Sequence, residues 1–219
     1  MQNQRPQSDC YFITGYTGRP GVRRPVSITD LYDTGVDNAG NALGDNVADI
    51  HYSIIAPTGF TATTVTADGF PIPPWVANTA TSRWIGTQLN DSQGPDGGEM
   101  IFRTHFTIGA DADLSSVVIN GLGATDDTLN DVVLNGLSLG SLFSGFGSLT
   151  SFSITSGFTT GLNTLDFLVQ NSSGFAVNPT GLRIQGINGS YETTVPEPST
   201  LALIALGMYA GRRRLTAKF

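Results

Sequence analysis

Cysteine is nearly absent from this sequence of 219 residues, because Cys10 is the only one. A single thiol cannot close an intrachain disulfide, and it cannot supply the thiolate cluster of a structural zinc site. Histidine is almost as rare, and the separation of His51 from His105 does not match the HExxH spacing of a zinc protease. The sequence therefore excludes a disulfide-stapled fold and a metal centre of either of these two kinds.

Charged residues are also few, at 13% of the chain, whereas glycine reaches 27 residues. The surface must then be covered largely by Ser, Thr, Asn and Gln, a composition that suits an extracellular β protein better than a helical cytosolic enzyme. Between residues 30 and 190 there are three arginines against fifteen acidic residues. Because such an acidic region repels phosphate backbones, we expect no nucleic-acid partner.

The body of the chain has no long apolar pattern with a helical period, and it shows short alternating segments instead. In residues 99–108, Met100, Phe102, Phe106 and Ile108 fall on one face of an extended strand. Further strands are predicted at residues 26–31, 50–56, 61–66, 116–120, 131–135, 149–154, 163–170 and 182–187. Short strands at this spacing predict an all-β domain over residues 26–190, a two-sheet antiparallel β-sandwich with jelly-roll topology favoured.

Asn-Gly pairs follow several of the predicted strands, at the kind of position where a tight hairpin turn needs positive φ angles. We interpret all three pairs as turns: Asn120-Gly121, Asn135-Gly136 and Asn188-Gly189.

The last 25 residues have a different organisation from the body. Two prolines precede an uncharged, mostly apolar segment at residues 201–211, and an arginine cluster follows it; the characteristic residues are Val195, Pro196, Glu197, Pro198, Arg212, Arg213 and Arg214. Eleven residues form a helix about 17 Å long, too short to span a hydrocarbon core of about 30 Å comfortably. We expect a Pro-rich linker at 191–200, a short hydrophobic helix at 201–211 and a basic cytoplasmic tail at 212–219.

In this order, the three parts resemble the PEP-CTERM sorting signal of bacteria that make extracellular polysaccharide. The resemblance implies an exported protein that is transiently inserted in the inner membrane through its C-terminal segment. It also implies a partner, an exosortase-type membrane enzyme that cleaves near Pro-Glu-Pro, and a final place in the cell envelope or outside the cell.

The N-terminal residues do not show the secretory signal that an exported protein needs, since no run of seven or more apolar residues occurs before Thr29. We expect residues 1–25 to be disordered or to belong to a misassigned start, with the true signal upstream.

A second resemblance rests on stretches within the body: ITDLYDTGVD at residues 28–37, DIHY at 49–52, the Pro- and Trp-containing segment at 69–86, and later pieces at 126–127, 133–136, 161–165 and 179–183. Together they resemble the galactose-binding-like jelly roll of carbohydrate-binding domains. This resemblance implies a sugar-binding module.

Trp75 and Trp84, the only tryptophans, share one loop-like segment. A flat aromatic ring on a loop is a platform for the apolar face of a pyranose, so both are candidate ligand-binding residues; packing at the end of the sandwich is the alternative. Arg103, on the polar face of its strand beside His105, is a third candidate, for a hydroxyl or carboxylate. A surface pair is the alternative there.

Oxygen-rich side chains gather in one short stretch that could hold a structural calcium ion, which takes six to eight oxygen ligands. The candidates are Asp126, Asp127, Asn130 and Asp131. Solvated turns are the alternative interpretation.

The segment 136–140 matches the G-x-S-x-G pattern of serine hydrolases, but no histidine follows Ser138 to complete a triad. No other set of acid, base and nucleophile is recognisable, so we expect a non-catalytic protein without a cofactor, apart from the candidate calcium. The favoured hypothesis is an exported envelope or extracellular-matrix protein with a module that binds exopolysaccharide. The alternatives are a passive structural matrix protein and, third, a polysaccharide-active enzyme.

Overall fold

The computed structural model describes residues 22–66, 69–87, 97–174 and 178–195. This part of the chain is all-β, and none of it forms a helix long and apolar enough to cross a membrane. The predicted helix at 201–211, the basic tail at 212–219 and residues 1–21 of the predicted N-terminal segment lie outside the described residues.

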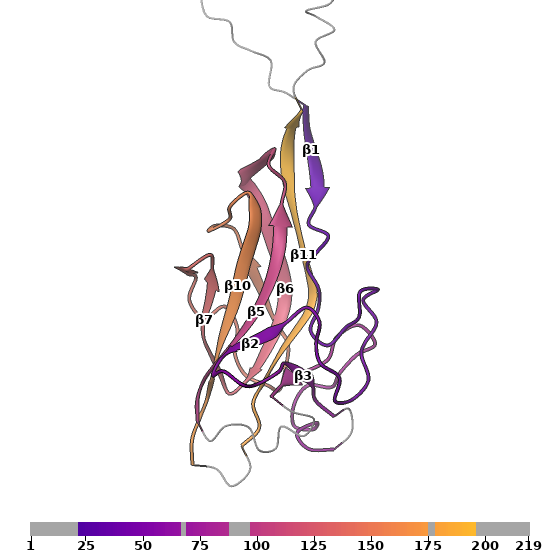
Figure 1. Cartoon of the computed structure of the whole chain (residues 1–219), viewed down its shortest axis with the longest axis vertical. Coiled ribbons are helices and arrows are strands. Elements are labelled where there is room, and N and C mark those ends of the chain that lie inside the picture. Colours follow the sequence, from indigo (N-terminus) through magenta and orange to yellow (C-terminus); the bar gives the residue numbers. More distant parts are fainter. Residues whose placement is uncertain (1–21, 67–68, 88–96, 175–177, 196–219) are drawn as a thin grey trace, which may run out of the picture. The chain divides into compact units, whose positions relative to one another are not determined.

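Two antiparallel sheets form the domain (Figure 1). The first sheet has the order β3-β4-β11-β6-β9, with β1 also paired to β11. Its strands are β1 (Val22–Ser27), β3 (Thr63–Thr64), β4 (Ile85–Gly86), β6 (Ala112–Asp126), β9 (Thr150–Ile154) and β11 (Gly181–Val195). The second has the order β2-β5-β10-β7-β8, made of β2 (Ser53–Ala56), β5 (Gly98–Ile108), β7 (Thr128–Leu134), β8 (Leu137–Ser138) and β10 (Gly161–Asn171). The prediction of a two-sheet antiparallel β-sandwich is confirmed.

The main core lies between the sheets and follows the alternation of the sequence. On β5, Phe102 and Phe106 are 0% exposed, and on the neighbouring β10, Phe167 and Val169 are also 0% exposed. Phe102 is directly opposite Phe167 in the register, so that two large side chains are neighbours across the two strands. Burial of such side chains supplies about 1.5–3 kcal/mol each and fixes which face of each strand points inward.

Only one of the three Asn-Gly pairs is a turn. Asn135 and Gly136 have φ angles of 52° and 82° and join β7 to β8, as expected for a type I′ hairpin. The pairs at 120–121 and 188–189 lie inside β6 and β11, and their prediction as turns is wrong. A β-carbon at Gly121 would lie 2.7 Å from the Phe152 ring, and one at Gly189 would lie 2.9 Å from neighbouring isoleucine atoms. Glycine is needed at both positions because a side chain would collide with these neighbours.

The sheet extends further at both ends than the predicted 26–190. β1 begins at Val22, and β11 continues to Val195 through residues that were predicted as linker. Pairing of β1 with β11 explains the extension, and Arg23 reinforces it through ion pairs of 2.9 Å to Asp113 and 2.8 Å to Glu192. The first and last described strands therefore lie side by side (Figure 1).

Candidate functional site

The two tryptophans form a second, smaller core at one end of the sandwich, together with Val65, Ile72 and Ala124. Trp75 and Trp84 are 3% and 0% exposed, and their ring centroids are 4.3 Å apart at an angle of 37°. Trp84 is fully buried, as the alternative of packing at the end of the sandwich implies, and its ring offers no surface to a ligand. Trp75 is also largely buried, but it lines a pocket.

Arg183 on β11 holds the segment that follows Trp75, a role that no sequence pattern indicated. It is 0% exposed, and its guanidinium donates to the carbonyl oxygens of Val76 (3.3 Å) and Ala77 and to Ser82 Oγ (3.1 Å). Burial lowers the pKa of Arg183 to about 10, against the opposing attraction of Asp33. The side chain thus fixes the backbone at Val76 and Ala77 and donates to the buried Ser82 hydroxyl oxygen, while the Val76 carbonyl also accepts from the Trp84 indole at 2.8 Å.

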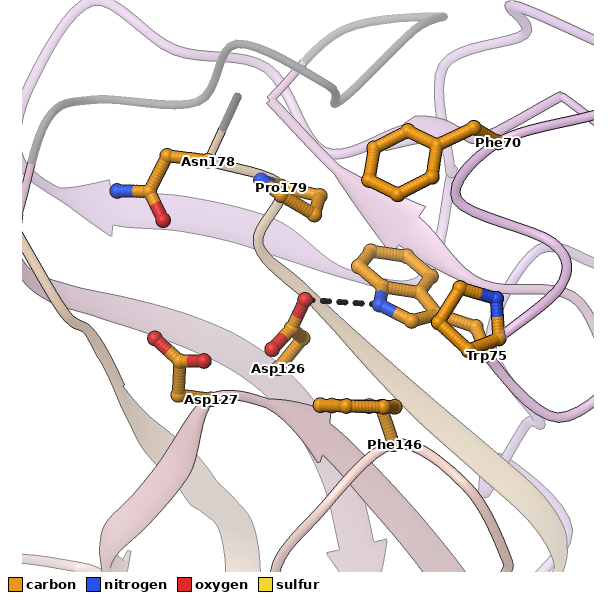
Figure 2. Close-up of a pocket in the computed structure, with 8 residues that line it drawn as sticks. Phe70, Trp75, Asp126, Asp127, Phe146, Asn178 and Pro179 are labelled. Atoms are coloured by element: carbon orange, nitrogen blue, oxygen red, sulfur yellow. Dashed lines mark hydrogen bonds between the residues drawn. The ribbon is translucent and has the colours of Figure 1, made fainter. Parts of the chain in front are cut away.

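The pocket beside Trp75 has a volume of about 210 Å³ (Figure 2). Segments far apart in the sequence supply its walls: the loop between β3 and β4, the end of β6, the loop before β9 and the residues preceding β11. The side chains that matter here are Phe70, Trp75, Asp126, Asp127, Phe146 and Asn178.

Aromatic and acidic groups meet in this pocket. Phe70 and Phe146 are 47% and 36% exposed, whereas Asp126 is only 4% exposed. Trp75 Nε1 donates a hydrogen bond of 2.8 Å to Asp126 Oδ2, and Figure 2 shows this pair between the two phenylalanine rings. No Lys, Arg or His side chain is among the described residues that line the pocket.

The polar wall of the pocket is fixed by the segment after β10. Asp127 Oδ2 accepts a hydrogen bond of 2.7 Å from the backbone N–H of Ser172. Asn178 Nδ2 donates to the carbonyl oxygen of the same serine at 2.6 Å. Asp127 and Asn178 are thereby both tied to one short segment, and their orientation does not depend on a ligand.

The structure does not bring the four predicted calcium ligands together. Asn130 Nδ2 donates to Glu99 Oε2 at 2.9 Å, and Asp131 Oδ1 accepts from Gly140 N at 2.7 Å. Only the two preceding aspartates line the pocket. Across residues 22–66, 69–87, 97–174 and 178–195 there is no group of three or more His, Cys, Asp or Glu side chains that could hold a metal ion. The calcium prediction is therefore not supported.

Arg103 has a carboxylate partner within the protein in place of the expected ligand. Its Nε and terminal nitrogen each lie 2.7 Å from one oxygen of Asp166, which is directly opposite on β10. This bidentate pair also raises the pKa of Arg103. His105 contacts Thr164 at 3.3 Å, and neither Arg103 nor His105 lines the pocket beside Trp75.

Comparison with known proteins concerns the C-terminal residues, where residues 194–214 match the family model of the PEP-CTERM protein-sorting motif. The chain carries this sorting motif. The match contains the predicted signal residues from Val195 to Arg214, and it indicates an exported protein that an exosortase recognises and processes at the membrane. No curated protein and no solved structure matches the chain.

The PEP-CTERM motif and the pocket are attached to opposite ends of one strand. The motif begins at residue 194, one residue before β11 ends at Val195, whereas the pocket residues Asn178 and Pro179 lie just before the start of β11 at Gly181. A strand of 15 residues spans up to about 50 Å at about 3.3 Å per residue. The pocket is therefore far from the point at which the sorting segment leaves the domain.

Proposed function

We propose that this exported protein is a non-catalytic component of the cell envelope or extracellular matrix, and that its β-sandwich, of the galactose-binding-like jelly-roll type, binds polysaccharide. The observation that carries the proposal is the pocket in which two exposed phenylalanine rings flank fixed carboxylate and amide groups. A short loop-borne cluster of this kind can bind one unit of a chain.

The chemistry of the pocket suits a sugar. The apolar C–H face of a pyranose packs on an aromatic ring, and Phe70 and Phe146 offer such rings at the surface. Hydroxyl groups of the same unit can donate to the carboxylate of Asp127 and interact with the amide of Asn178, which lie on the polar side of the pocket. Rings and acceptors together provide both affinity and orientation.

The acidic residues of the pocket support binding better than catalysis. A general acid must hold a proton before the reaction, as the raised-pKa carboxyl of a glycosidase does. Asp126 is 4% exposed, and its Oδ2 already accepts a hydrogen bond of 2.8 Å from the Trp75 indole. We therefore assign Asp126 the task of orienting Trp75.

The position of the pocket fits a protein that is held by its C-terminal end. The pocket residues precede the start of β11, whereas the sorting segment follows the end of this strand. After processing near Pro-Glu-Pro, the same pocket would retain the released domain on polysaccharide. The sorting signal supplies delivery, and the pocket supplies retention.

The proposal is tested by binding of the full chain to a panel of immobilised bacterial and algal polysaccharides, in a polyoxyethylene detergent that contains no sugar. Replacement of Phe70 and Phe146 by Ala should weaken binding to the preferred glycan by tenfold or more, since each ring contributes about 1 kcal/mol or more. Phe60→Ala is the matched control, because Phe60 is 39% exposed and does not line the pocket.

Two results would contradict a glycan-binding function. One is the absence of saturable binding to every polysaccharide, and the other is equal binding by the double variant and the Phe60→Ala control. Either result would favour the alternative, a passive structural component placed by its sorting signal alone.

A further inference from the structure

We infer that the pocket selects amino sugars, units that carry a free ammonium group, over neutral N-acetylated and anionic ones. This inference rests on the proposed glycan binding and names the class of sugar that this pocket takes. It starts from an imbalance in the pocket, which combines two carboxylates with three aromatic rings and has no cationic side chain among its described lining residues.

The aromatic rings favour a cation as well as a sugar face. An ammonium group within about 6 Å of an aromatic ring is attracted by the ring quadrupole, by about 0.5–1 kcal/mol at an exposed site. Phe70 and Phe146 are exposed on both sides of the Trp75–Asp126 pair, so a cation that enters between them meets a ring on either side (Figure 2). The same rings would hold the C–H face of the unit that carries the ammonium group.

The carboxylates add an attraction that a neutral sugar does not experience. Asp127 accepts a hydrogen bond from a neutral backbone N–H, that of Ser172, and the pocket lining that the structure describes contains no Lys or Arg side chain. Asp126 contributes a second carboxyl group to the lining of the same 210 Å³ volume. A uronic acid would place a third carboxylate beside these two, an unfavourable contact.

The net charge of the domain around the pocket also favours a cationic ligand. Between residues 22 and 195 the chain has five arginines and no lysine, against fifteen acids from 30 to 166 alone. Three of those arginines, Arg23, Arg83 and Arg103, are bound to carboxylates by ion pairs. The field of the domain is therefore negative, and it attracts a cationic polymer and repels an anionic one.

The decisive experiment compares three oligosaccharides of equal length with the full chain: a β-1,4-linked glucosamine tetramer, its N-acetylated form and a uronic-acid tetramer. We expect the glucosamine tetramer to bind about tenfold or more tightly than the N-acetylated form, and the uronic-acid tetramer to bind most weakly. The preference for the glucosamine tetramer should decrease as salt is added and as its amino groups lose their protons at higher pH.

The variant Asp127→Asn separates charge from shape. Its side-chain oxygen can still accept from Ser172 N, so the pocket is preserved while one negative charge is lost. We expect the preference for the glucosamine tetramer over the N-acetylated tetramer to fall about fivefold, because the glucosamine tetramer loses more affinity than the neutral one. Asp131→Asn is the matched control. It also removes one carboxylate, but Asp131 lies on β7 and does not line the pocket.

The outcomes distinguish the two claims. Equal affinity for the glucosamine and N-acetylated tetramers, or tighter binding of the uronic-acid tetramer, overturns the inference and leaves glycan binding in place. An equal loss of preference in Asp131→Asn and Asp127→Asn shows a general charge effect, and this also overturns assignment of the selectivity to the pocket. Failure of all three tetramers and of the polysaccharide panel overturns both claims.

Discussion

Replacement of Arg183 by Met tests whether the buried guanidinium holds the tryptophan end of the sandwich. The variant keeps the apolar stem and removes the donors to the carbonyl oxygens of Val76 and Ala77 and to Ser82. A buried acceptor without a partner costs about 1–3 kcal/mol, and the Ala77 carbonyl and the Ser82 hydroxyl oxygen both lose this donor, whereas the Val76 carbonyl keeps the Trp84 indole N–H at 2.8 Å. Part of this cost is offset because a charge no longer has to be buried, so the net loss of unfolding free energy should be about 3 kcal/mol.

The measurement is urea unfolding followed by tryptophan fluorescence and by circular dichroism. Trp75 and Trp84 are the only tryptophans of the chain, so fluorescence reports on the end of the domain that Arg183 supports. A loss of about 3 kcal/mol lowers Tm by roughly 6–12 °C in a domain of this size. Fluorescence should change at a lower urea concentration in the variant than in the unchanged protein.

Arg103→Met is the matched control for this experiment. The Arg103 side chain is 33% exposed and has one carboxylate partner, so its loss should cost about 1 kcal/mol. An Arg183→Met variant that is no less stable than Arg103→Met would refute the reasoning, because it would mean that water satisfies the Ala77 carbonyl and the Ser82 hydroxyl oxygen.

Three further predictions concern stability. Gly123→Ala should lose about 2–3 kcal/mol by urea unfolding, because the new β-carbon would lie 2.4 Å from a core phenylalanine ring; Gly147→Ala, which meets nothing within 4 Å, should be neutral. A double-mutant cycle on Arg103 and Asp166 should give a coupling of about 1 kcal/mol that decreases with salt, and no coupling would contradict the bidentate pair. Burial raises the pKa of Asp33 above its ordinary value. The unchanged protein should therefore lose stability relative to Asp33→Asn as pH rises from below the ordinary pKa through the raised one, and a pH-independent difference would contradict this.

The sequence predicted the strands well where hydrophobic alternation is long. The 99–108 segment became β5 almost unchanged, because its inward residues are large and its outward ones polar. Strands β4 and β8 were missed, since two residues cannot show a period. The pairs Asn120-Gly121 and Asn188-Gly189 were wrongly predicted as turns because both a tight turn and a closely packed strand require glycine. The two cases can be distinguished only from the neighbouring phenylalanine ring and isoleucine side chains in the folded protein.

The pocket could be predicted only in part. Trp75 and the two adjacent aspartates were singled out, each for a role other than the one it has in the fold. Phe70 and Phe146 were missed because they are 76 positions apart in the sequence. Only the folded chain brings them to the same pocket. The PEP-CTERM motif, by contrast, is contiguous, and its parts could be recognised without any fold.

Fractionation of exosortase-containing cells that produce the chain tests the whole account most directly. The unchanged protein should appear in the polysaccharide matrix with a mass that shows cleavage near Pro-Glu-Pro. A Phe70→Ala/Phe146→Ala variant should be processed to the corresponding mass but be released into the medium, whereas Phe60→Ala should stay in the matrix. Retention of the double variant at the level of the unchanged protein would contradict the claim that the pocket holds the domain on polysaccharide.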